Sequence, residues 1–189
     1  MHEFTAANAR MGAQPPPRVV FLTGFMGAGK TSVGRALATR LDWQFVDLDE
    51  RVEQQQGRSI AQIFRESGEA AFRVAEHAAL ASLLQQAAEH AMVTALGGGT
   101  LSQPQNAQRL RQAAAALVFL DAPLEVLLAR CRPAASQRPL FKDEASFRRL
   151  YESRLPDYRS ASLRVDTANR TPEDVAAEIA TALGLDRRA

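Results

Sequence analysis

A glycine-rich segment near the N-terminus has the residue types and the spacing of a phosphate-binding loop. From Gly24 to Thr31 the chain reads GFMGAGKT, which matches the pattern G-x-x-x-x-G-K-[ST]. Glycines let successive backbone N–H groups converge on an anion, Lys30 adds a positive charge, and the Thr31 hydroxyl can ligate Mg²⁺. The helix that must follow directs the positive end of its dipole at the same anion. The segment predicts binding of ATP or GTP.

An acidic pair further along the chain could serve the acceptor of a phosphoryl group. Asp47 and Asp49 alternate at the end of an apolar segment that is expected to be a strand, so their carboxylates are expected on one face of it. Asp47 would then lie near Mg²⁺ through water. Asp49 would accept a hydrogen bond from the acceptor hydroxyl and act as general base.

Two arginines are candidates for holding an acidic acceptor. Arg73 lies three residues before Glu76 on an expected helix, so the carboxylate can orient the guanidinium. Arg154 lies in a segment where Pro156 is expected to end a helix and aromatic side chains can shield the charge. A planar guanidinium suits a carboxylate on the acceptor, because it donates two parallel hydrogen bonds.

Short apolar segments that alternate with helical patterns indicate how these residues are positioned. Expected strands cover residues 19–22, 43–49, 92–96, 116–121 and 163–166. One expected helix begins at residue 30. The other expected helices cover residues 59–89, 104–114, 123–130, 143–158 and 171–183, and the first of these is interrupted near Gly68. This order predicts a three-layer α/β/α fold with a five-stranded parallel sheet. In such sheets the ligand lies beyond the carboxyl ends of the strands, where the phosphate loop, the acidic pair and the glycines 97–99 would meet.

Composition limits the class of protein. A chain of 189 residues with 46% hydrophobic residues suits one domain, and a net charge of +2 with scattered arginines predicts no nucleic-acid partner. The chain has one cysteine and no apolar run near the roughly 18 residues of a membrane span, so we expect a cytoplasmic protein without a membrane partner. Residues 1–17, with three prolines, are expected to form a disordered tail before a single domain at 18–189.

Six segments in the same order closely resemble the shikimate kinase family. They are GFMGAGKTSVGRALA at 24–38, DLDE at 47–50, IFRESGEAAFRVAEHAAL at 63–80, GGG at 97–99, RPL at 138–140 and YESRLPDYRSAS at 151–162. The resemblance covers residues 18–183. It implies a P-loop kinase similar in fold to the nucleoside monophosphate kinases, which transfers the γ-phosphate of ATP to the 3-hydroxyl of shikimate in chorismate and aromatic amino acid biosynthesis.

The resemblance also implies roles for individual residues. Lys30, Asp49 and Arg138 would be catalytic, and Mg²⁺ would be held by Thr31 and, through water, by Asp47. Residues expected to bind ATP are Gly27, Ala28, Gly29, Lys30, Thr31, Ser32, Arg138 and Arg170. Residues expected to bind shikimate are Asp49, Arg73, Gly97, Gly98, Gly99 and Arg154. A substrate-binding segment at about 50–80 and a lid at about 131–142 are expected, in a protein that works as a monomer on ATP and shikimate.

One position departs from the pattern of the family. An arginine often lies seven residues before the lid arginine, and here Cys131 occupies that position between Arg130 and Arg132. Either arginine could therefore reach ATP.

Two alternatives remain open from the residues alone. The first is another small-molecule kinase of the same architecture, such as a gluconate or nucleoside monophosphate kinase, since fold alone does not fix the acceptor. The second is an ATP-binding regulator without activity, which would be expected to lack a phosphate-binding or acceptor-binding group or to carry a DNA-binding segment.

Overall fold

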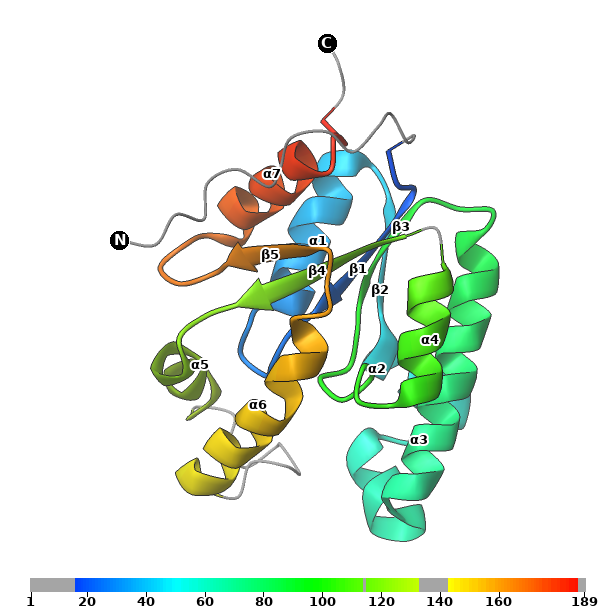
Figure 1. Ribbon diagram of the computed structural model, residues 1–189. Helices are drawn as coiled ribbons and strands as arrows, with labels where there is room; N and C mark the ends of the chain where they lie inside the picture. Colours follow the sequence, from blue (N-terminus) through cyan, green and yellow to red (C-terminus); the bar gives the residue numbers. More distant parts are fainter. Residues whose placement is uncertain (1–15, 114, 133–142, 187–189) are drawn as a thin grey trace.

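A parallel sheet of five strands forms the centre of the molecule, in the order β2-β3-β1-β4-β5. The computed structural model describes residues 16–113, 115–132 and 143–186 (Figure 1). The strands are β1 (Val19–Thr23), β2 (Gln44–Asp47), β3 (Met92–Ala95), β4 (Ala116–Asp121) and β5 (Leu163–Asp166). Every residue of β1 and β3 is buried, as expected of strands that are covered on both faces. The predicted five-stranded parallel sheet is confirmed.

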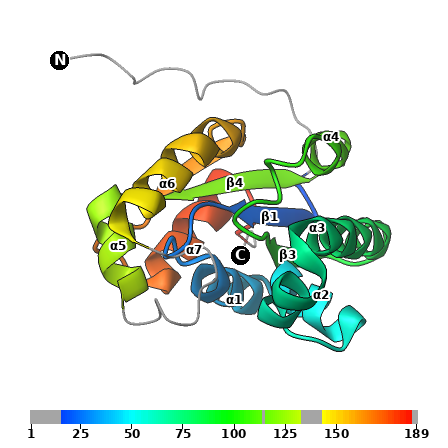
Figure 2. The same ribbon diagram turned by 90° about the horizontal axis from the view of Figure 1, so that it is seen from below.

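Helices cover both faces of this sheet. They are α1 (Lys30–Leu41), α2 (Leu48–Gln56), α3 (Ile60–Ala87), α4 (Pro104–Gln112), α5 (Leu124–Cys131), α6 (Glu144–Tyr158) and α7 (Pro172–Ala182). Helices α1 and α7 pack against each other on one side of the sheet, and α4 and α6 lie on the other side (Figure 2). The structure thus has the three layers that the sequence predicts.

Side chains at the helix ends explain several of the boundaries. The Thr171 side chain accepts a hydrogen bond from the backbone N–H of Asp174 at the start of α7, the position at which this helix was expected to begin. Ser59 and Gln62 form a capping box at the start of α3. The interruption expected near Gly68 is present, because this residue has φ 79° within α3.

The end of β2 differs from the prediction. The strand ends at Asp47, whose side chain caps α2 by accepting a hydrogen bond from the backbone N–H of Asp49. Asp49 therefore lies in the first helical turn. The expectation that Asp47 and Asp49 alternate along one strand is wrong, because the capping bond starts a helix between them.

Proline has a different effect from the one expected at two places. Pro123 is the N-cap of α5 and not its first residue. Helix α6 continues through Pro156 to Tyr158, which confirms the helix expected at 143–158 and corrects the expectation that Pro156 ends it. Tertiary contacts hold this last turn, because Tyr158 is buried and Asp157 accepts a hydrogen bond from Ser102.

The segments expected to form a tail and a lid lie mostly outside the described residues. This applies to residues 1–15 and 133–142, and therefore to Arg138. Cys131, expected at the start of the lid, is the last residue of α5 and is buried. Among the helices that the structure describes, none is both long enough and apolar enough to cross a membrane.

Candidate active site

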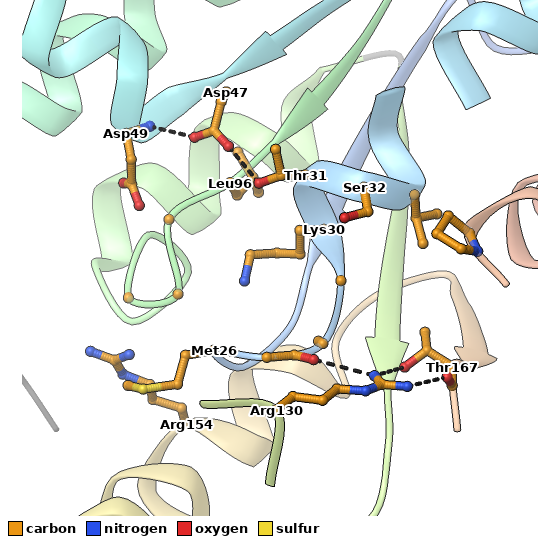
Figure 3. Close-up of a pocket in the computed structure, with 18 of the residues that line it drawn as sticks. Met26, Lys30, Thr31, Ser32, Asp47, Asp49, Leu96, Arg130, Arg154 and Thr167 are labelled. Atoms are coloured by element: carbon orange, nitrogen blue, oxygen red, sulfur yellow. Dashed lines mark hydrogen bonds between the residues drawn. The ribbon is translucent and has the colours of Figure 1, made fainter. Parts of the chain in front are cut away.

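A cavity of about 780 Å³ lies at the carboxyl ends of the strands. Its walls come from the loop after β1, the end of β2, helix α3, the loop after β3, helix α6 and the start of α7 (Figure 3). The three sequence segments that were expected to share one crevice, the phosphate loop, the acidic pair and the glycines 97–99, therefore do so. The cavity has two parts, one near α7 and one near α3 and α6, and the phosphate loop lies between them.

The phosphate loop runs from β1 to the first residue of α1. Gly27 and Gly29 have φ 83° and 91°, a backbone region that other residues rarely adopt. The Lys30 ammonium group donates hydrogen bonds to the carbonyls of Gly24 at 2.8 Å and Phe25 at 3.2 Å. These bonds hold the lysine over its own loop, within the cavity.

Helix α5 packs directly beneath this loop. A Cβ atom added to Gly27 would lie 2.9 Å from both Cys131 Sγ and the Leu127 carbonyl oxygen. A side chain at Gly27 is therefore excluded by space as well as by backbone conformation. Cys131 contributes packing here, since it is fully buried.

The Thr31 hydroxyl and the Asp47 carboxylate form a second feature of the site. Thr31 Oγ1 donates to Asp47 Oδ2 at 2.8 Å, while Asp47 Oδ1 accepts from the backbone N–H of Asp49 at 3.0 Å. A hydroxyl and a carboxylate beside a phosphate loop are the oxygen ligands that Mg²⁺ prefers. Ser32 lies on the same turn of α1 and also faces the cavity (Figure 3).

Asp49 lies deeper in the cavity, towards the loop after β3. Desolvation and then the neighbouring charge of Asp47 raise the pKa of Asp49 to about 6, while Lys30 acts in the opposite direction. A Cβ atom on Gly97 would lie 2.7 Å from Asp49 Oδ1 and 2.9 Å from Glu76 Oε1. The absence of a side chain at Gly97 thus lets two carboxylates approach the loop.

Arg73 of α3 and Arg154 of α6 converge on Gly99. A Cβ atom on this glycine would lie 2.9 Å from Arg73 Nη2 and 3.0 Å from Arg154 Nη2. Arg154 is only 8% exposed, and no carboxylate of the described part of the chain forms an ion pair with it. Two buried or half-buried guanidinium groups at one point could hold a carboxylate.

Arg73 is held by two glutamates. It pairs with Glu76 at 3.0 Å, which confirms the predicted i, i+3 pair, and with Glu69 at 2.9 Å. Glu76 is fully buried and also accepts a hydrogen bond from the Thr100 hydroxyl at 2.7 Å. The contact with Glu69 was missed, although its i, i+4 spacing is visible in the sequence.

Apolar side chains form one wall of the part of the cavity near α3 and were not predicted as site residues. Ile60, Phe64 and Phe72 line the cavity, and the rings of the two phenylalanines lie 5.0 Å apart. They fall within the segment 50–80 that was expected to bind substrate. In the sequence they follow a helical period, which indicates core packing as readily as a ligand site. Met26 and Arg154 both line the cavity, and Met26 was missed because it occupies a variable position of the loop pattern.

The part of the cavity near α7 contains Arg130. Its guanidinium donates to the Gly27 carbonyl at 3.2 Å and to the Thr167 carbonyl at 2.7 Å. Arg132 is exposed and pairs with Glu144 at 3.6 Å. Of the two arginines beside Cys131, only Arg130 lines the cavity.

Arg170 lines the same part of the cavity, together with Pro172 and Val175. Its guanidinium pairs with Glu178 and donates to the Asp166 carbonyl at 3.1 Å. These contacts hold the side chain against the start of α7. Arg138, the remaining residue expected near ATP, lies outside the described residues.

Comparison with known proteins identifies relatives over most of the chain. The sequence model of the shikimate kinase family (SKI) matches residues 26–184. The shikimate kinase of Geobacter sulfurreducens is 42% identical over 167 residues, which cover 87% of this chain and 90% of that protein. That of Persephonella marina is 34% identical, over 86% of this chain and 96% of that protein.

Solved structures give the same picture. Shikimate kinase from Acinetobacter baumannii in complex with shikimate matches with a TM-score of 0.82 and 34% identity, over 90% of this chain and 95% of that one. A gluconokinase from Sinorhizobium meliloti matches with a TM-score of 0.56 and 20% identity, over 89% and 92%. At this lower identity the second likeness shows the fold alone.

Proposed function

The chain belongs to the shikimate kinase family, and we propose how its cavity performs transfer of the ATP γ-phosphate to the 3-hydroxyl of shikimate, giving shikimate 3-phosphate and ADP. The convergence of Arg73 and Arg154 on Gly99 carries this proposal. Shikimate is a hydroxy acid, and two guanidinium groups at one end of the cavity fit its carboxylate. The phosphate loop, at the other side of Asp49, fits the donor.

The donor half would hold ATP along the phosphate loop. The backbone N–H groups of residues 27–32 and the ammonium group of Lys30 would surround the β- and γ-phosphates. In the structure described here its ammonium group binds the carbonyls of Gly24 and Phe25, and it would direct one or more of its three N–H donors to the phosphates. The adenine would lie near Arg130, Arg170 and Pro172, which line the far part of the cavity.

Mg²⁺ fits the oxygen atoms beside the loop. The Thr31 hydroxyl would ligate it directly, and Asp47 would hold it through water. When bound, the ion supplies positive charge to the phosphate oxygens. The Thr31 to Asp47 hydrogen bond at 2.8 Å shows that both groups reach the same point.

The acceptor half would hold shikimate between the glycine loop and α3. Arg73 and Arg154 would bind its carboxylate, and the backbone of Gly97, Gly98 and Gly99 would lie close to its ring because no side chain intervenes. The apolar wall of Ile60, Phe64 and Phe72 would cover the ring, which is itself largely carbon. Asp49 would accept a hydrogen bond from the hydroxyl that reacts.

The chemical step needs alignment and charge neutralisation more than covalent help from the protein. The Asp49 carboxylate would take the proton of the 3-hydroxyl of shikimate while the oxygen of that hydroxyl forms a bond to the γ-phosphorus. The bond from that phosphorus to the bridging oxygen of ADP breaks in the same step. Lys30 would stabilise the charge on the transferred group, and we propose that Arg138 of the lid does so from the opposite side.

The test of this function is an assay of ADP release, in which coupling enzymes that end in a dehydrogenase report the ADP formed. We expect turnover with shikimate and none with gluconate or CMP, the acceptors of the alternative kinases. Lys30→Ala is the control for the donor half, because loss of its charge should lower kcat by about 10²- to 10³-fold. Turnover of gluconate or CMP without turnover of shikimate would refute the assignment. A cytoplasmic location, a monomeric state and the absence of a nucleic-acid partner stay predictions.

A further inference from the structure

Tyr158, the last residue of α6, connects the protein core with the glycine loop. Its ring is 1% exposed and stacks on Phe119 of β4, with ring centroids 5.5 Å apart. Its hydroxyl donates a hydrogen bond to the carbonyl oxygen of Gly98 at 2.5 Å. The ring is therefore fixed by the sheet, and its polar end acts on the middle residue of the loop.

The same hydroxyl meets Arg154, which lies one helical turn earlier on the same face of α6. Burial raises the pKa of the Tyr158 phenol to about 12, while the charge of Arg154 and a hydrogen bond with it act in the opposite direction. A Cβ atom on Gly98 would lie 3.2 Å from Arg154 Nη1 and 3.7 Å from the Tyr158 hydroxyl. The hydroxyl that binds the loop and the Arg154 guanidinium group thus lie beside the same glycine.

A second hydrogen bond joins the same two elements at their exposed edge. The Ser102 hydroxyl donates to Asp157 Oδ2 at 2.7 Å. The segment after β3 is therefore fixed to the last turn of α6 at two points, one buried and one exposed. These contacts also hold α6 in helical form beyond Pro156.

We propose that Tyr158 is a positioning residue for the acceptor, because its hydroxyl sets the Gly98 carbonyl and the Arg154 guanidinium in one fixed arrangement. This inference rests on the proposed function, in which Arg154 binds the substrate carboxylate. A guanidinium binds a carboxylate well only when both hydrogen bonds are aligned, so a small displacement of Arg154 weakens the acceptor. The hydrogen bond itself joins α6 to the loop after β3 and includes no residue of the phosphate loop.

The role predicts that acceptor and donor respond differently to loss of the hydroxyl. Without it the Gly98 carbonyl loses its buried partner and Arg154 loses a polar neighbour beside Gly98, whereas the ring still stacks on Phe119. A role in folding alone would have another result. It would reduce the number of active molecules and hence the apparent kcat, and would leave both KM values unchanged.

Tyr158→Phe is the test, with Tyr151→Phe as matched control. Tyr151 is the other tyrosine of the chain, lies on the same helix, and packs edge-on against Phe25 with ring centroids 5.4 Å apart. In Tyr158→Phe we expect the KM for shikimate to rise about tenfold, with the KM for ATP within about twofold of the native value. Tyr151→Phe should leave both within about twofold. An unchanged KM for shikimate, or an equal rise for both substrates, would overturn the inference.

Two further measurements separate the possible failures. If the native protein does not turn over shikimate, the proposed function is wrong, and the inference that Tyr158 positions the residues that bind shikimate is wrong with it. If the native protein is active and Tyr158→Phe does not fold, Ser102→Ala loosens the same loop from its exposed side. Its KM for shikimate should then rise about two- to threefold while that for ATP stays constant. An unchanged KM for shikimate in Ser102→Ala would count against the inference that contacts between α6 and the loop after β3 position the acceptor.

Discussion

The Thr31 hydroxyl donates a hydrogen bond to Asp47 across 2.8 Å and so joins the first turn of α1 to the end of β2. The strand that leads to Thr31 and the strand that ends at Asp47 are not neighbours, because β3 lies between them in the sheet. The contact therefore depends on the strand order. It brings the residues proposed for Mg²⁺ to one point, beside the loop proposed for the phosphates.

Asp47→Asn should weaken the use of Mg²⁺. The amide keeps the size of the side chain but removes the negative charge that would hold the ion through water. Loss of such an outer ligand typically lowers metal affinity about 10- to 100-fold. The measurement is the Mg²⁺ concentration at half-maximal rate, and full chelation should abolish turnover. Glu50→Gln is the control, because this exposed carboxylate pairs only weakly at the surface with Arg35 at 3.3 Å. An equal shift in both variants would contradict the role of Asp47.

Arg154→Lys should weaken the acceptor and not the donor. Lysine keeps the charge but cannot donate two parallel hydrogen bonds to one carboxylate. We expect the KM for shikimate to rise about 10- to 100-fold, with little change in that for ATP. Arg148→Lys is the matched control, because Arg148 lies on the same helix and is 48% exposed in its side chain. An unchanged KM for shikimate in Arg154→Lys would argue against a carboxylate at this position.

Gly99→Ala tests the convergence of the two guanidinium groups directly. The added methyl group would lie 2.9 to 3.0 Å from Arg73 and Arg154, so at least one of them must move. We expect a rise of about 10-fold or more in the KM for shikimate, because a misplaced fork loses part of its hydrogen bonding. Gly57→Ala provides the comparison, since no atom lies within 4 Å of its added Cβ. That variant should lose about 1 kcal/mol of stability through its positive φ and keep its KM values.

The sequence predicts the parts of the site that follow from local spacing. The phosphate loop is one continuous motif, and the pair of Arg73 and Glu76 follows from their separation by three residues on a helix. The five strands are visible because each is a short apolar run ended by polar residues or glycine. Such signals need no knowledge of the tertiary structure.

Features that depend on tertiary contacts could not be predicted in this way. The place of Asp49 depends on a side-chain cap that starts a helix where the pattern indicates a strand. A helix to Tyr158 was expected, but the local sequence also offers Pro156 as its end, and the burial of Tyr158 decides for continuation by compensating for the lost backbone hydrogen bond. The choice of Arg130 over Arg132 depends on the rotation of α5 against the phosphate loop. In each case packing decides between alternatives that are equal in the local sequence.

Asp49→Asn should make the protein more stable at neutral pH while it removes the proposed base. The pKa of Asp49 is about 6 in the folded protein and about 3.8 in the unfolded chain, so the folded state binds the proton more tightly. Ionisation of this carboxylate therefore lowers the free energy of unfolding. The loss is absent below about pH 3.8, grows between the two pKa values and is complete above about pH 6. For metal-free and nucleotide-free protein at pH 7.5, the cited pKa values correspond to about 3 kcal/mol.

Urea unfolding at two pH values measures this effect. In Asp49→Asn the free energy of unfolding should exceed that of the native protein by up to about 3 kcal/mol at pH 7.5 and by about half as much at pH 5. Asp186→Asn is a control of opposite sign, because hydrogen bonds from Thr181 and Arg40 lower the pKa of Asp186. Its loss should destabilise the protein at pH 7.5 and less so in acid. If Asp49→Asn is no more stable than the native protein at pH 7.5, or is more stable by the same amount at both pH values, the pKa of Asp49 is not raised by its surroundings. A gain in stability together with a loss of kcat would mean that the fold keeps a costly charge where the transfer of a proton requires it.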